Sequence, residues 1–137
     1  KKMSKSELSD LSRINLTDDK DQIINKIKKA KTDPLPLPTN IKELDKRPEA
    51  KNLLGIFSSL TNLNLEESVK KFEGKNFSEF KDNLSQVLVE KIVPISNEIK
   101  KLTNDKEYLN KILSEGNQKA NDIASSKLKK IHEILGF

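Results

Sequence analysis

Several residue types are absent or rare in this 137-residue chain, and each absence excludes a class of site. There is no cysteine, which excludes disulfides and thiolate metal sites. The single histidine, His132, provides neither a histidine-based metal cluster nor a catalytic triad. Only four glycines occur, and no glycine-rich phosphate loop is among them. We therefore expect no protein-bound metal.

Long hydrophobic runs are also missing. No apolar stretch approaches the length of about 18 residues that a membrane helix needs, and no secretory signal is recognisable. Together with the absence of cysteine, this favours a cytoplasmic protein without a membrane partner. Apolar and charged residues each make up 34% of the chain, so the apolar residues must be well patterned to build a core.

The net charge of +5 is unevenly distributed. Residues 1–31 carry a balance of +4, whereas residues 32–137 carry only +1. A modest basic excess suits a polyanionic partner, although it is also compatible with an ordinary solvated surface.

Apolar residues recur at helical spacing through most of the chain. The pattern predicts a helix capped by Thr17 or Asp18 and ending near Lys31, and helices over about 48–60, 64–73, 78–102 and 105–135. Pro94 should kink the fourth helix and Gly116 should bend or interrupt the fifth. No segment alternates with period two, so the predicted fold is an all-α helical bundle.

Three prolines in the segment TDPLPLPTN favour an extended connection rather than a helix. The expected organisation is therefore residues 1–31, a proline-rich connection over 32–47, and a helical domain over 48–137. Residues 1–16 show no helical period. We expect a loop there, with a short extended piece over residues 13–16.

The most informative stretch is KMSKS at residues 2–6. It offers the ammonium groups of Lys2 and Lys5 together with the hydroxyl groups of Ser4 and Ser6. A loop of this composition can wrap a pyrophosphate and neutralise negative charge as it leaves. Flexible lysine side chains suit a site that closes and reopens.

KMSKS is also the second signature of class I aminoacyl-tRNA synthetases, and the rest of the chain resembles the tryptophanyl-tRNA synthetase family. SRINLTDDKDQIINKIKKAKTD is similar to the family's segment after the signature. NLLGIFSSLTN, FEGKNFSEFKDNLSQVLVEKIVPI and LSEGNQKANDIASSKLKKIHEILGF resemble three later blocks, in the family's order. The resemblance covers essentially all 137 residues.

This resemblance implies a C-terminal part of a tryptophan–tRNA ligase. The parent would make tryptophanyl-adenylate from tryptophan and ATP, with Mg²⁺ on the nucleotide, and transfer tryptophan to tRNA(Trp). Lys2 and Lys5 would act on the ATP phosphates, with Met3, Ser4 and Ser6 shaping the loop. The Rossmann-type domain would lie upstream of Lys1. It would hold the tryptophan pocket and the homodimer contacts, so the present chain alone should be monomeric and inactive.

The helical domain would bind the anticodon side of the tRNA. The candidate contacts are four lysines, and the loop at residues 74–76 is expected to leave backbone donors free beside positive charge. These lysines are Lys75, Lys81, Lys100 and Lys101. Two alternatives stay open at this point: a part of a tyrosyl-tRNA synthetase, or a stand-alone helical interaction module in which KMSKS occurs by chance.

Overall fold

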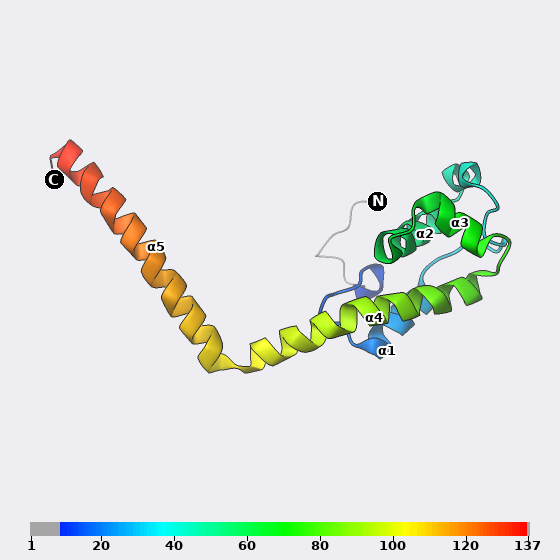
Figure 1. Ribbon diagram of the computed structural model, residues 1–137, viewed down its shortest axis with the longest axis horizontal. Coiled ribbons are helices and arrows are strands. Elements are labelled where there is room, and N and C mark those ends of the chain that lie inside the picture. Colours follow the sequence, from blue (N-terminus) through cyan, green and yellow to red (C-terminus); the bar gives the residue numbers. More distant parts are fainter. Residues whose placement is uncertain (1–8, 137) are drawn as a thin grey trace. The chain divides into compact units, whose positions relative to one another are not determined.

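The computed structural model describes residues 9–136, and all regular structure in that range is helical (Figure 1). The predicted all-α fold is therefore confirmed. The chain forms two compact units, and the boundary between them in the sequence lies between Asn97 and Glu98. The elements in chain order are η1 (Asp10–Ser12), α1 (Lys20–Lys29), η2 (Ile41–Lys46), α2 (Pro48–Thr61), α3 (Leu65–Phe72), α4 (Phe77–Asn104) and α5 (Lys106–Leu135).

The core of the first unit is centred on three phenylalanines, one from each of three helices. Phe72 of α3 packs edge-on against Phe57 of α2 and Phe80 of α4, with ring centroids 4.9 and 4.8 Å apart. Such edge-to-face contacts add to the free energy of burying the rings. Ile23 and Ile27 of α1 and Leu44 of η2 belong to the same buried cluster. The core therefore joins all three segments that the sequence separates.

Most helix starts follow the sequence signals. Pro48 occupies the first turn of α2, and Asn64 and Glu67 form the predicted capping box of α3. The cap of α1 was predicted wrongly, because Asp19 caps this helix in a capping box with Gln22. The first regular element is also a correction: Asp10–Ser12 is a turn of 3₁₀ helix within the segment expected to be a loop.

The proline-rich connection contains no helix up to residue 40, as predicted, but Ile41–Lys46, also expected to belong to the extended segment, form the 3₁₀ helix η2. The connection is also part of the packed structure. Leu37 is 2% exposed, and its backbone exchanges hydrogen bonds with the loop after α3: its N–H donates to Lys75 O, and its carbonyl accepts from Gly74 N. Arg47 binds the start of the connection through a two-pronged pair with Asp33, with Nη2–Oδ1 and Nε–Oδ2 distances of 2.6 and 3.0 Å. The same guanidinium donates to the carbonyl of Pro36 at 2.6 Å.

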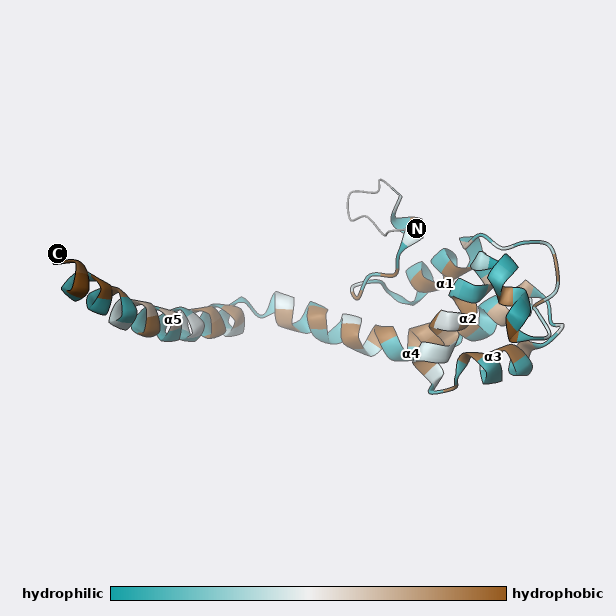
Figure 2. Cartoon of the chain, turned by 90° about the horizontal axis from the view of Figure 1, so that it is seen from above, coloured by the Kyte–Doolittle hydropathy of each residue, from teal (hydrophilic) through white to brown (hydrophobic). Residues whose placement is uncertain are grey.

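The second unit consists of the last turns of α4 and the 30-residue helix α5. Asp105 caps α5 as predicted, accepting a hydrogen bond from Tyr108 N at 2.9 Å. The helix runs uninterrupted through Gly116, so the predicted break is wrong. Apolar residues recur along α5 (Figure 2), and none of its residues is buried. The helical periodicity of the sequence therefore predicted the helix correctly, although the apolar face of this helix is not buried.

Replacing Arg47 by methionine tests the anchoring of the connection. The change removes the Arg47 hydrogen bonds to the carbonyls of Leu35 and Pro36 and to the Asp33 carboxylate, which keeps its bond from Leu35 N. The free energy of unfolding should therefore fall by about 2–3 kcal/mol. Urea unfolding followed by circular dichroism measures this. Lys51→Met is the control, because it removes an exposed pair with Asp45 and should cost at most about 0.5 kcal/mol. Equal losses in both variants would contradict the anchoring role.

The same pair predicts a pH dependence. Hydrogen bonds from Arg47 lower the pKa of Asp33 below its usual 3.8. The unfolded chain therefore binds this proton at a higher pH than the folded chain does. The stabilisation is fully present above pH 3.8 and is lost as the pH falls through the folded value. The Arg47→Met variant should lack this part of the acid dependence.

Candidate functional site

The five residues of the KMSKS motif lie outside the described residues, so the predicted contacts of Lys2, Met3, Ser4, Lys5 and Ser6 with ATP phosphates stay predictions. The segment that follows the motif belongs to the described residues from Ser9 onward. From Ser9 to Asp19 that segment lies against α1, and η1 packs on this helix.

A buried ammonium group connects this segment to α1. The Nζ atom of Lys26 lies 2.5 Å from Asp10 Oδ2 and 2.6 Å from Asp18 Oδ2. The Lys26 side chain is 6% exposed, and that of Asp18 is 4% exposed. Burying a cation is costly unless oxygen atoms replace its water, and two carboxylates do so here.

Further hydrogen bonds complete the cluster around these carboxylates. Asn15 donates from its backbone N–H to Asp18 at 2.8 Å and from Nδ2 to Asp10 at 3.0 Å. Arg13 Nε lies 2.9 Å from Asp10 Oδ1. We call Asp10, Arg13, Asn15, Asp18 and Lys26 the Lys26 cluster. Its two cations balance its two carboxylates.

The pKa values of the cluster reflect this pairing. For Lys26, burial favours the neutral amine, but hydrogen bonds with Asp10 and Asp18 outweigh it, so the pKa is raised above 10.5. Hydrogen bonds from Lys26 and Asn15 lower the pKa of Asp10 below 3.8. Lys26 and Asp10 are therefore both charged at neutral pH.

Sequence reasoning missed the Lys26 cluster, although a signal was present. Lys26 lies three residues after Ile23 and one before Ile27, which places it on the buried face of α1. A charged residue on an apolar face needs a partner, and the aspartates upstream were the available ones. Asp18 was instead interpreted, with Thr17, as a possible helix cap.

Lys75 lies in the turn between α3 and α4, and it forms an exposed pair with Glu79 at 2.6 Å. The backbone donors expected to be free beside it are occupied. Gly74 N donates to Leu37 O, Lys75 N donates to Phe72 O, and Asn76 accepts from Glu79 N to cap α4. The expectation of free backbone donors at residues 74–76 is therefore wrong for the first two of these residues.

Lys81 has a structural role that the sequence did not suggest. Its Nζ atom donates to Ala30 O at 2.6 Å and Lys28 O at 3.1 Å, the carbonyls at the C-terminal end of α1. A cation at this end of a helix satisfies carbonyls without an intrahelical partner and interacts favourably with the helix dipole. Burial lowers the pKa of Lys81. This lysine links α4 to α1.

The other two candidates belong to the second unit. Lys100 and Lys101 are exposed on the last turns of α4, and Lys101 lies 3.5 Å from Glu98. Lys75 and Lys81 belong to the first unit. The four predicted tRNA contacts are therefore divided between the two units. The structure does not define a single basic patch that contains all four.

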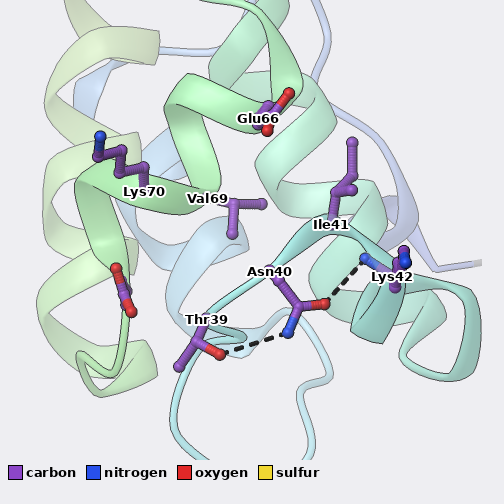
Figure 3. Close-up of a pocket in the computed structure, with 8 residues that line it drawn as sticks. Thr39, Asn40, Ile41, Lys42, Glu66, Val69 and Lys70 are labelled. Atoms are coloured by element: carbon purple, nitrogen blue, oxygen red, sulfur yellow. Dashed lines mark hydrogen bonds between the residues drawn. The ribbon is translucent and has the colours of Figure 1, made fainter.

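A shallow groove lies between the start of η2 and α3 (Figure 3). Thr39, Asn40, Ile41 and Lys42 form one side, and Glu66, Val69, Lys70 and Glu73 form the other. The lining contains two lysines and two glutamates, so it favours neither an anion nor a cation. Among residues 9–136, no group of His, Asp or Glu side chains is arranged to hold a metal ion. No helix in this range is long and apolar enough to span a membrane.

Comparison with known proteins identifies the family to which the chain belongs. The model of the family described as tRNA synthetases class I (W and Y) matches residues 1–93, from the signature through most of α4. The chain belongs to this family. A chance KMSKS in an unrelated helical module is thereby ruled out.

The relatives include three bacterial tryptophan–tRNA ligases. The proteins of Mesorhizobium japonicum and Agrobacterium fabrum are 46% and 45% identical to the chain over all 137 residues. The protein of Rickettsia felis is 47% identical over the same length. The chain spans 39% of the first two relatives and 41% of the third, about two fifths of their length.

The bridge from Lys81 to α1 predicts a loss of stability on mutation. Lys81→Met should lower the free energy of unfolding by about 1–2 kcal/mol, because the last carbonyls of α1 lose a charged donor. Lys75→Met is the matched control: its exposed pair should contribute at most about 0.5 kcal/mol. Chemical unfolding of both variants measures the difference. If Lys81→Met proves as stable as the control, the capping role is wrong.

Proposed function

We propose that the chain is the C-terminal part of a tryptophan–tRNA ligase. The parent enzyme activates tryptophan with ATP, releasing pyrophosphate, and then transfers tryptophan from the adenylate to tRNA(Trp). The observation that carries this proposal is the 45–47% identity, over all 137 residues of the chain, to tryptophan–tRNA ligases of three genera. The family also includes tyrosine enzymes. Charging assays of the parent with tryptophan and tyrosine distinguish the two amino acids.

The signature loop supplies positive charge in this proposal. Lys5, assisted by Lys2, neutralises the charge that builds up on the departing pyrophosphate, and Ser4 and Ser6 donate hydrogen bonds to phosphate oxygens. Met3 shapes the loop. Mg²⁺ arrives with the nucleotide, so no protein ligand for it is assigned within this chain. The chemistry of the donors, two ammonium groups and two hydroxyls, suits a polyphosphate.

The helical part is proposed to contact the anticodon side of tRNA(Trp) through Lys75, Lys100 and Lys101, whose exposed ammonium groups can reach phosphates. Lys81 stays in the proposal only as a secondary contact, because its ammonium group already binds α1. The parent is further proposed to act in the cytoplasm as a homodimer joined through its upstream domain. The present chain alone is expected to be a monomer.

The role of Lys5 is testable in the full-length enzyme. Lys5→Ala should slow tryptophanyl-adenylate formation by roughly 10²–10³-fold, the scale for losing one preorganised electrostatic contact. Tryptophan affinity should change little, because this lysine interacts with the phosphates. Single-turnover activation kinetics and equilibrium tryptophan binding separate these effects. An unchanged activation rate would remove Lys5 from the mechanism. The isolated 137-residue chain should give no tryptophan-dependent pyrophosphate exchange above background.

The tRNA contacts can be tested without disturbing Lys81. Neutralising two exposed lysines in the full-length enzyme, Lys75→Gln with Lys100→Gln, should raise the KM for tRNA by roughly threefold to tenfold. Tryptophan activation should be unaffected. The control removes the same charge at Lys46 and Lys51, which are exposed on other elements. Equal tRNA kinetics in the two double variants would exclude Lys75 and Lys100 as tRNA contacts.

A further inference from the structure

The Lys26 cluster occupies an informative position in the sequence. Asp10 follows Ser6, the last residue of the motif, by four residues. Four residues of chain span at most about 14 Å, so fastening Asp10 limits where the C-terminal end of the motif can lie. The cluster is therefore an anchor close in sequence to the signature loop.

This anchor is attached to the core through α1. Ile23 and Ile27, on either side of Lys26, are 0% and 4% exposed within the main apolar cluster. The other end of α1 is held by Lys81 of α4. Contacts therefore run without a gap from the core through α1 and Lys26 to Asp10.

Stability alone does not account for an ion pair at this position. Replacing buried charges by apolar side chains of similar volume is often neutral or stabilising. An apolar residue at position 26 would continue the face that Ile23 and Ile27 present, but it could not hold Asp10. Directional bonds to two carboxylates fix the path of residues 10–18, whereas apolar packing is not directional.

We propose that Lys26, acting through Asp10 and with Asp18 as its buried counter-ion, is a positioning residue for the signature loop. It does not touch ATP. It fastens the chain four residues after the motif and so restricts where Lys5 can meet the phosphates. Because misplacing a reacting group can cost a large factor in rate, an anchor this close in sequence to Lys5 should affect the reaction. This inference rests on the proposed function.

Asp10→Ala in the full-length enzyme is the direct test. The Asp10 side chain is 49% exposed, and its removal leaves the buried pair of Lys26 and Asp18 intact, so folding should be preserved. We expect adenylate formation to slow about tenfold to a hundredfold, with unchanged tryptophan affinity and a Tm that falls only slightly, because Lys26 keeps its buried partner Asp18. Asp45→Ala is the matched control, because it removes an exposed aspartate paired with a lysine far along the chain from the motif.

A double-mutant cycle separates positioning from general damage. If Asp10 acts through Lys5, Asp10→Ala should slow the reaction little further once Lys5→Ala is present. Fully additive effects would overturn the inference, and so would an Asp10→Ala rate equal to that of the Asp45→Ala control. If Lys5→Ala itself leaves the rate unchanged, the proposed role of the motif fails instead.

Variants at Lys26 provide a second test. Lys26→Arg keeps a cation that can bridge two carboxylates and should retain most of the activation rate. Lys26→Met should lose at least as much activity as Asp10→Ala. If Lys26→Met is folded and fully active, the positioning role is wrong. If it does not fold, the Asp10→Ala cycle still decides.

Discussion

Buried cations need oxygen partners, and much of the irregular chain in the first unit is organised by this requirement. Lys26 gathers Asp10 and Asp18, Arg47 gathers Asp33 and the carbonyl of Pro36, and Lys81 closes the C-terminal end of α1. Each ties a segment without helical period, or a helix end, to a helix of the core. Because the helices pack through apolar side chains, they tolerate small shifts, whereas charge-assisted hydrogen bonds of 2.5–3.1 Å fix a direction.

The phenylalanine cluster and these cations have different tasks. Phe57, Phe72 and Phe80 contribute the apolar burial that holds α2, α3 and α4 together. The cations add little apolar area, but they determine where the polar connections lie. In the proposed enzyme the cations have a functional meaning, since the segment after the signature is polar and is attached to α1 by Lys26. The proposed positioning of the signature loop depends on this attachment.

The four candidate lysines show how burial divides residues that look alike in a sequence. Lys75, Lys100 and Lys101 carry exposed ammonium groups that a phosphate can approach. Lys81 has the same side chain, but its ammonium group already replaces water with two backbone carbonyls. A change at Lys81 therefore alters folding as well as charge, and a loss of tRNA binding in such a variant has two physical explanations.

Local chemistry in the sequence was enough to determine the all-α fold, the caps at Asn64 and Asp105, the proline start of α2 and the extended connection, because these depend on residues a few positions apart. Four spaced blocks also determined the family. Only the tertiary structure decided that Asp18 pairs with Lys26 instead of capping α1, that the carbonyl of Leu37 accepts from the N–H of Gly74, and that Lys81 caps α1 from 51 residues away. The physical reason is that the partner of a buried polar group is chosen by three-dimensional proximity. Periodicity can place such a group on a buried face, but it does not name the partner.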